Sequence, residues 1–177
     1  FVNARKFKWD ASLNLTTVKN SISGLPTPIN TGEVSGQGLT GAFAQILANG
    51  YSIFSWSMPV FNGFDGNGNA RYANGAANQI VGSALPKVFA GLTNNFSFGN
   101  WNVSAFLNTI RGHYIYNNTA NALFLKGSLR NARNVTNAIG NGPENPFNPG
   151  SVSTRFLEKG DFVRLSNLNV NYNFNIK

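Results

Sequence analysis

The stretch NLNVNYNFNIK, residues 167 to 177, alternates between two kinds of side chain. A period of two predicts a β-strand, because successive side chains of a strand point to opposite faces. The amide positions are Asn167, Asn169, Asn171, Asn173 and Asn175. The apolar positions are Leu168, Val170, Tyr172, Phe174 and Ile176. A soluble sandwich would pack the apolar face on its core, whereas a membrane β-barrel would turn it to lipid and the amides to its lumen.

The composition favours ordered β structure with an unusual polar surface. The 177 residues include 29 asparagines and 19 glycines, and 42% of the residues are hydrophobic. Charged residues make up only 11%, less than half of the usual share of about a quarter. A polar surface of amides suits a hydrated interior that does not repel a neutral cargo. The chain has no cysteine, so the redox compartment stays open.

The formal net charge of +8 raises the question of an anionic partner. Basic residues gather near the start of the chain and again between Lys126 and Arg133. Neither group is a long run, and no RNA-binding, zinc or helix-turn-helix pattern accompanies them. The sequence therefore predicts no nucleic-acid partner.

A hairpin is predicted around Gly99-Asn100, because glycine in the first position suits a two-residue type II′ turn. Such a turn sets the register of both strands. The apolar-face pairs are then Phe98 with Trp101, Phe96 with Val103, Asn94 with Ala105, and Leu92 with Leu107. The polar-face pairs are Ser97 with Asn102 and Asn95 with Ser104. A slip of one residue would invert every face, so this register is strongly specified.

The connections between the predicted strands alternate in length. The turns at 48–50 and 99–100 are short, whereas those at 19–35, 61–86 and 114–152 are long. This alternation is typical of outer-membrane barrels, which have short periplasmic turns and long extracellular loops. Sandwiches can show the same mixture of loop lengths.

The sequence thus predicts an all-β fold: a segment of an antiparallel transmembrane β-barrel with about six or seven strands, short periplasmic turns and long extracellular loops. The aromatics beside the short turn match the girdle that such barrels place at a lipid interface. The lipid-facing set then comprises Phe96, Phe98, Trp101 and Val103, with Leu168, Val170, Tyr172, Phe174 and Ile176. The five asparagines from Asn167 to Asn175 would face the lumen.

Several stretches resemble SusC/RagA-type TonB-dependent transporters, which are outer-membrane importers of Bacteroidota. The most specific is STRFLEKGDFVRLSNLNVNYNF, residues 153–174. The strand and Gly-Asp-Gly-rich loop GYSIFSWSMPVFNGFDGNGNARY, residues 50–72, and the hairpin from 80 to 117 are also similar to the family. FKWDASLNLTTVKNSISGLP, residues 7–26, fits the strand that precedes them.

The resemblance implies a transporter with about 22 strands around a plugged lumen, in the bacterial outer membrane. Residues 1–177 would be a late part of that barrel, with the plug domain and the final strands absent. The implied partners are a SusD-like surface lipoprotein, TonB through the absent plug, outer-membrane lipid and lipopolysaccharide. The implied cargo is an oligosaccharide or a peptide.

The residues that could carry chemistry favour neither an enzyme nor a metal or cofactor site. Asp65, Asn67 and Asn69 have the spacing of a calcium loop, but Ala76 stands where such a loop needs glutamate. His113 is the single histidine and has no cysteine partner for zinc. No pair of carboxylates is placed across a predicted cleft.

Aromatic residues in the long connections are the candidate contacts for cargo or for the lipoprotein. They are Phe64, Tyr72, Tyr114, Tyr116 and Phe147. Packing of the loops on one another is the simpler explanation for any single one of them. A second hypothesis is a soluble carbohydrate-binding β-sandwich, and a third is an adhesive β protein.

Overall fold

The computed structural model describes residues 1–4, 6–36 and 38–174, and it divides into two compact units. The sheet unit comprises Phe1–Lys19, Pro86–Gly112 and Gly160–Lys177. The short-strand unit comprises Asn20–Leu85 and His113–Lys159. Within the described ranges, no helix is long and apolar enough to cross a membrane.

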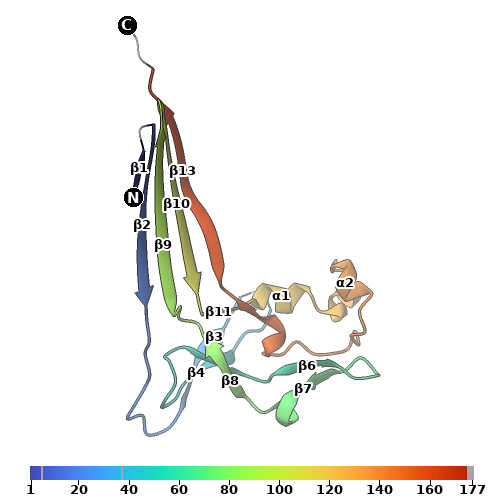
Figure 1. Ribbon diagram of the computed structural model, residues 1–177. Helices are drawn as coiled ribbons and strands as arrows, with labels where there is room; N and C mark the ends of the chain where they lie inside the picture. The colour runs from blue at the N-terminus through green and yellow to red at the C-terminus, as the bar shows by residue number, and fades with distance from the viewer. Residues whose placement is uncertain (5, 37, 175–177) are drawn as a thin grey trace. The chain divides into compact units, whose positions relative to one another are not determined.

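One five-stranded antiparallel sheet forms the sheet unit, in the order β1-β2-β9-β10-β13 (Figure 1). The strands are β1 (Val2–Ala4), β2 (Phe7–Thr17), β9 (Val88–Phe98), β10 (Trp101–Arg111) and β13 (Phe162–Tyr172). All but β1 have 11 residues. A tilted strand of roughly 9–11 residues spans a bilayer, so these four have the length that a barrel wall needs.

The predicted hairpin register is confirmed in full. Strands β9 and β10 pair Phe98 with Trp101 and Phe96 with Val103, and the ladder continues without a break. Gly99 has φ of +55°, while Asn100 stays outside the left-handed region, as a type II′ turn requires. On the polar face, Ser97 donates a hydrogen bond to Asn102 at 2.8 Å.

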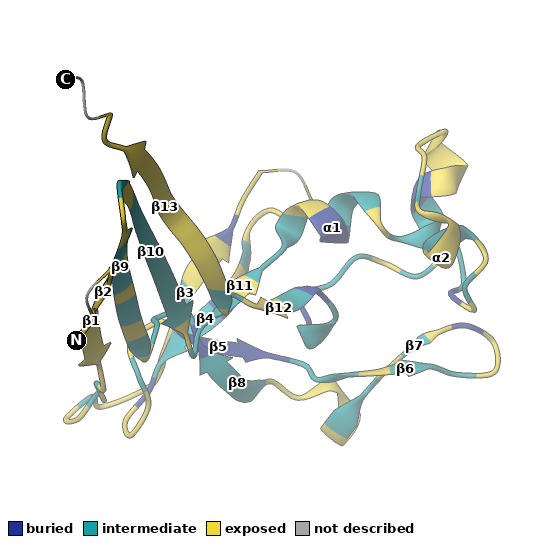
Figure 2. Ribbon diagram, turned by 45° about the horizontal axis from the view of Figure 1, so that its top comes forward, coloured by how far each residue is buried: buried dark blue, intermediate teal, exposed yellow. Residues whose placement is uncertain are grey.

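Both faces of this sheet are open at its two outer long strands. Every residue of β2 is exposed, and β13 is exposed from Val163 to Tyr172 (Figure 2). A sandwich strand buries every second residue, so the alternation of β13 does not mark a core face here.

Short strands and helical turns make up the second unit. Its four-stranded sheet has the order β3-β4-β5-β8. These strands are β3 (Ile29–Val34), β4 (Ala42–Leu47), β5 (Ser55–Met58) and β8 (Gln79–Ser83). Two strand pairs accompany it: β6 (Phe61–Phe64) with β7 (Ala70–Tyr72), and β11 (Tyr114–Tyr116) with β12 (Leu157–Lys159). The helical elements are η1 (Ala73–Ala76), α1 (Asn118–Leu123), η2 (Lys126–Asn131), α2 (Asn137–Gly140) and η3 (Thr154–Phe156).

A small apolar core holds the short-strand unit together. Val34, Ala44, Trp56 and Met58 form it, and Met58 and Ala44 are fully buried. The Trp56 indole Nε1 donates to the Tyr114 carbonyl at 3.0 Å, so the one polar atom of that side chain is satisfied.

One expected loop and one expected turn differ from the structure. Among the described residues four strands have 11 residues, and the expected number of about six or seven barrel strands stays a prediction. Strand β5 is buried at all four of its positions and belongs to a core. Residues 29–34, expected in a loop, form β3. Residues 48–54 make a longer connection than the expected turn at 48–50. Within it, the Asn49 side chain bonds the Leu25 backbone in both directions, at 2.7 and 2.9 Å.

Candidate functional site

The register of the long sheet gathers apolar side chains from four strands on one face. Residues directly opposite each other in an antiparallel ladder lie on the same face, so each row of the sheet can be followed across it. The row nearest the turn holds Phe7, Phe98, Trp101 and Tyr172. The next rows hold Trp9, Phe96, Val103 and Val170; Ala11, Asn94, Ala105 and Leu168; and Leu13, Leu92, Leu107 and Leu165. The lipid-facing residues expected in β9, β10 and β13 therefore share one face.

Aromatic rings concentrate at the turn end of this face. Trp9 stacks on Phe96 with ring centroids 6.1 Å apart. Tyr172 lies edge-on to Trp101 at 4.8 Å and to Phe174 at 4.7 Å. Trp and Tyr rings with a polar atom suit a membrane interface, where one end is apolar and the other is hydrated.

One amide interrupts the apolar face, and a neighbour satisfies it. Asn94 lies in the third row, between Ala11 and Ala105. The Trp9 indole Nε1 donates to Asn94 Oδ1 at 3.2 Å. An amide without a partner is costly in an apolar medium, so this bond offsets part of that cost.

The opposite face carries amides and hydroxyls near the turn. Asn167, Asn169 and Asn171 lie there, opposite Phe106, Ser104 and Asn102. Asn173 is exposed beyond the strand, and its N–H donates to the Asn100 carbonyl at 2.9 Å. Asn175 and Ile176 lie outside the described residues.

Away from the turn, this polar face also carries large apolar side chains, which the sequence analysis did not predict. Its last rows hold Phe89, Phe106, Ile110 and Phe162. Gly91 makes room for Phe106, because a Cβ at position 91 would lie 3.1 Å from that ring. These apolar residues could have been found by following the alternation of β9 and β10 to the strand ends far from the turn.

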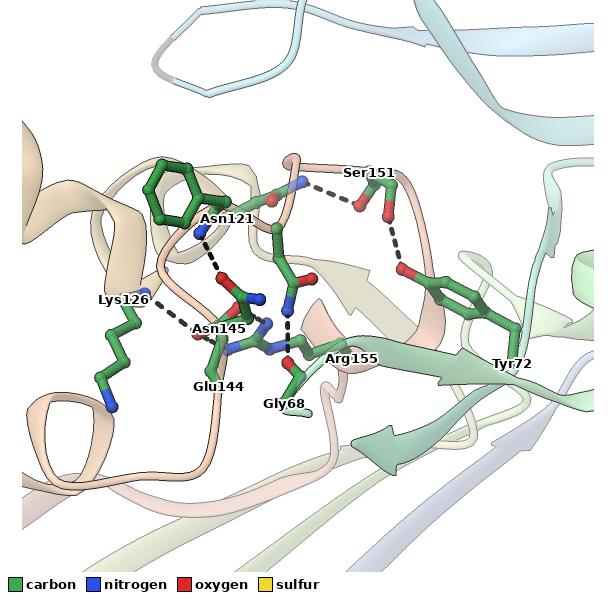
Figure 3. Close-up of polar contacts among 10 residues, drawn as sticks. Gly68, Tyr72, Asn121, Lys126, Glu144, Asn145, Ser151 and Arg155 are labelled. Atoms are coloured by element: carbon green, nitrogen blue, oxygen red, sulfur yellow. Dashed lines mark hydrogen bonds and ion pairs between the residues drawn. The ribbon is translucent and has the colours of Figure 1, made fainter. Parts of the chain in front are cut away.

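In the short-strand unit, four of the five candidate aromatic contacts are half-buried. Tyr114 and Tyr116 pack against the core cluster. Tyr72 forms a 2.8 Å hydroxyl contact with Ser151 (Figure 3). Phe64 lies edge-on to Phe61, with centroids 5.2 Å apart. Their rings hold the loops to one another, which leaves less of each for a ligand.

Phe147 is the exception, because 70% of it is exposed. The Arg130 guanidinium carbon lies 4.0 Å from its ring centroid, a cation–π distance. The Asn145 side chain accepts the Phe147 N–H at 2.9 Å and holds the turn. Both side chains line a hollow of about 250 Å³ that also contains Arg133.

A buried ion pair joins the segments that carry these aromatics (Figure 3). Arg155 donates to Glu144 through both terminal nitrogens, at 2.5 and 2.9 Å. The Lys126 N–H donates to the same carboxylate at 3.0 Å. The Arg155 guanidinium also lies over the rings of Phe61 and Phe64, 5.5 and 5.1 Å from their centroids.

Burial alone raises the pKa of Glu144, since only 3% of its side chain is exposed. Hydrogen bonds from Arg155 and the Lys126 backbone, with both positive charges, outweigh burial, and the net pKa lies below its usual value. The carboxylate is therefore ionised at neutral pH. It shapes the loops and has no open side from which to act on a ligand.

The calcium-like spacing at Asp65 has a local explanation. The Asp65 carboxylate accepts the N–H groups of Asn67 and Asn69 at 2.9 and 2.8 Å. The bonds from Asn69 come first among the causes that lower the pKa of Asp65. Within the described ranges no three His, Cys, Asp or Glu residues are placed to hold a metal ion.

The chain is similar in sequence to one curated protein, the TonB-dependent receptor P3 of Formosa agariphila. The two are 27% identical over 119 residues, which covers 64% of this chain and 12% of the relative. The resemblance to SusC/RagA-type TonB-dependent transporters is confirmed. No protein-family model matches the chain.

The fold is similar to solved structures of a peptide transporter named RagAB. The TM-scores are 0.72 for the transporter, 0.71 for its "open-open" state and 0.69 for its "closed-closed" state, at 19–20% identity. Each match covers 97% of this chain and 21% of the solved chain. The chain thus spans about a fifth of these structures. The similar proteins are named as a receptor and as transporters, in agreement with the expectation that the chain is not an enzyme.

Proposed function

We propose that this chain supplies part of the wall and of the extracellular loops of a TonB-dependent importer in the bacterial outer membrane. The sheet unit would be the wall, with its apolar face in lipid and its amide face toward the lumen. The short turn at Gly99 would lie at the periplasmic end. The cargo would be an oligosaccharide or a peptide, taken up together with a SusD-like surface lipoprotein and driven through TonB.

The observation that carries this proposal is a single sheet of 11-residue strands with faces of opposite polarity and both faces open. Water does not favour so large an apolar surface, and exposed apolar patches of this kind mark interaction or membrane sites. Leu168 and Val170 are 57% and 56% exposed on one face, opposite a face of amides. A soluble sandwich would bury one of the two faces, and β2 and β13 bury neither.

Single-cysteine labelling tests the wall directly, because these 177 residues contain no cysteine. The full-length protein, with any cysteine outside residues 1–177 replaced by serine, would be labelled at Val170→Cys or Asn171→Cys with an environment-sensitive fluorophore and reconstituted in lipid. We expect an apolar signal quenched by lipid-borne quenchers at 170, and a water-accessible signal at 171. Val103→Cys and Asn102→Cys form a matched pair on the neighbouring strand. Equal signals within both pairs would contradict the proposal.

The short-strand unit would provide the contact with lipoprotein or cargo, and Phe147 is the best-placed of its candidates. Its ring is exposed, braced by Arg130, and beside a hollow that contains Arg133. The other candidates would act indirectly, by packing the loops against one another. They are Phe64, Tyr72, Tyr114 and Tyr116. Support for a peptide cargo comes from the RagAB structures, whose titles name a peptide transporter and a peptide importer.

Deletion of residues 118–150 in the full-length protein tests this second part. We expect the barrel to assemble while uptake and co-purification of the lipoprotein are lost. The finer variant Phe147→Ala should weaken one of the two, and Phe124→Ala is a control at another exposed aromatic. Uptake and co-purification at wild-type level after the deletion would exclude this loop as the docking surface.

A further inference from the structure

The apolar face of the long sheet contains a hollow of about 220 Å³. Its walls come from β2, β9, β10 and β13, so it is complete within one sheet of this chain. The lining residues are Leu13, Ala90, Leu92, Leu107, Asn108, Thr109 and Val163.

The hollow exists because two neighbouring positions in one row carry small side chains. Ala90 and Thr109 pair with each other between Leu15 and Val163. The row below is filled by leucines from all four strands. Leucine at both positions would make the apolar face flat. The small side chains instead leave a hollow that an apolar chain can enter.

A cation is bonded to Thr109, one of the residues that line the hollow. Arg111 is exposed on the same face, and its Nε donates to Thr109 Oγ1 at 3.2 Å. That hydroxyl in turn donates to the Phe162 carbonyl at 2.5 Å, so its acceptor side is held toward the guanidinium. Within the described residues the terminal nitrogens of Arg111 have no protein partner, and Arg155–Glu144 is the ion pair that the structure contains.

We propose that this hollow binds one acyl chain of a lipid A molecule while Arg111 binds its phosphate. An acyl chain suits an apolar hollow in a lipid-facing wall, and a guanidinium pairs with phosphate through parallel N–H bonds. The inference rests on the proposed orientation, which places the end opposite the Gly99 turn in the outer leaflet, where lipid A lies. The aromatic rows at the turn end would then mark the inner interface, and Arg111 the outer one.

Lipid retention on the full-length protein, purified in mild detergent, tests the site by native mass spectrometry with added bisphosphorylated lipid A. Arg111→Gln removes the cation, and Ala90→Leu fills the hollow. Arg111→Gln should lower retention about fivefold, the scale of one basic residue near an anionic lipid surface. Ala90→Leu should lower retention as well, because it fills the space that the acyl chain would occupy. Arg164→Gln, on the opposite face of the sheet, and Ala11→Leu, on the same face outside the hollow, are the matched controls and should retain lipid A as the wild type does.

The probes separate the two parts of the site and its possible ligands. Lipid A without phosphates should respond to Ala90→Leu but not to Arg111→Gln. Phosphatidylglycerol retained as tightly as lipid A would overturn the assignment to lipid A. Equal effects of Arg111→Gln and Arg164→Gln would overturn the site. If the label at 170 reports lipid and the label at 171 reports water while Arg111→Gln leaves lipid A retention unchanged, the lipid A site is overturned but not the proposed membrane wall. If both labels report water, the proposed membrane wall is itself overturned.

Discussion

Strands β5 and β13 belong to the same chain but differ in how far their side chains are buried. All four residues of β5, Ser55 to Met58, are buried, whereas β13 is exposed on both faces from Val163 to Tyr172 (Figure 2). Strand β5 is buried on both faces as part of a small core. Strand β13 belongs to a single-layer sheet, and the described residues of its unit form no buried core. The first is stabilised by packing among side chains, and the second depends on what surrounds it.

The largest expected effect is in the short-strand unit. Glu144→Ala leaves the Arg155 guanidinium, whose side chain is only 13% exposed, without its carboxylate. Breaking a buried pair in this way costs about 3–5 kcal/mol. Limited proteolysis of the full-length protein should show rapid cleavage within 114–159. Glu158→Ala should change little, because Glu158 is an exposed acid that accepts one hydrogen bond, from the Asn117 side chain, among the described residues.

The same carboxylate makes the loops sensitive to acid. The folded pKa of Glu144 is lowered, so its contribution to stability is fully present above the ordinary glutamate pKa of about 4.3. That contribution is lost as the pH falls through the lower, folded pKa. Protease protection of 114–159 should therefore decline only below about pH 4. A loss of protection that is complete at pH 6 would point to another group.

Truncation of an apolar side chain should destabilise the short-strand unit more than the sheet unit. Met58→Ala opens a cavity at a fully buried position and should cost about 2–5 kcal/mol. Leu168→Ala, at a position that is 57% exposed, should cost about 1 kcal/mol or less, because lipid tails are as apolar as leucine. Thermal denaturation in detergent, followed separately for each unit by a label, measures both. Similar costs would erase the contrast between packed core and single-layer wall.

A charge placed on each face of the wall sharpens the comparison within one strand. Leu168 lies one row further from the turn than the aromatic rows, toward the middle of the wall. Leu168→Arg should therefore cost about 2–4 kcal/mol, whereas Asn169→Arg should cost little. The reason is that lipid cannot solvate the guanidinium and a watery lumen can. Reversible urea unfolding in lipid vesicles gives the two values. Equal costs at adjacent positions would mean that both faces meet the same medium.

The smallest expected effect concerns the amide on the apolar face. Trp9→Phe keeps an aromatic ring, although a smaller one, and removes the donor to Asn94, at a cost of about 1 kcal/mol in lipid. Adding Asn94→Leu should recover that loss, because no polar atom then needs a partner. Trp101→Phe is the control for the ring change alone. A double variant as unstable as Trp9→Phe would show that the bond is not the cause.

The long hairpin was predictable because its rules are local. A two-residue turn at Gly99 fixes the register, and a period of two then assigns every side chain of β9 and β10 to a face. The same period predicted a strand over residues 167–177, and the structure confirms it from Asn167 to Tyr172, where β13 ends. The strand begins earlier, at Phe162, and contains a bulge: Phe106 pairs with Asn167 and Leu107 with Leu165. Nothing in the alternation of single residues announces that irregularity.

The short-strand unit was less predictable because its contacts join distant parts of the chain. Residues 29–34 become a strand by pairing with β4, and the glycine and proline nearby had indicated only a loop. The exposure of Phe147 and the half-burial of Tyr72 depend on neighbours 17 and 79 residues away, Arg130 and Ser151. The sequence therefore could not distinguish the exposed aromatic in these loops from the half-buried ones.

The sequence by itself determined a two-faced β-sheet, its central register and the aromatic end beside the short turn. Those features depend on turn geometry and on the alternation of side chains along a strand, which neighbours in sequence decide. Only the tertiary structure decided which strands form a core, which loop aromatics remain open, and where the Glu144–Arg155 pair and the hollow beside Arg111 lie. The physical reason is that burial and pairing arise from segments brought together across the chain.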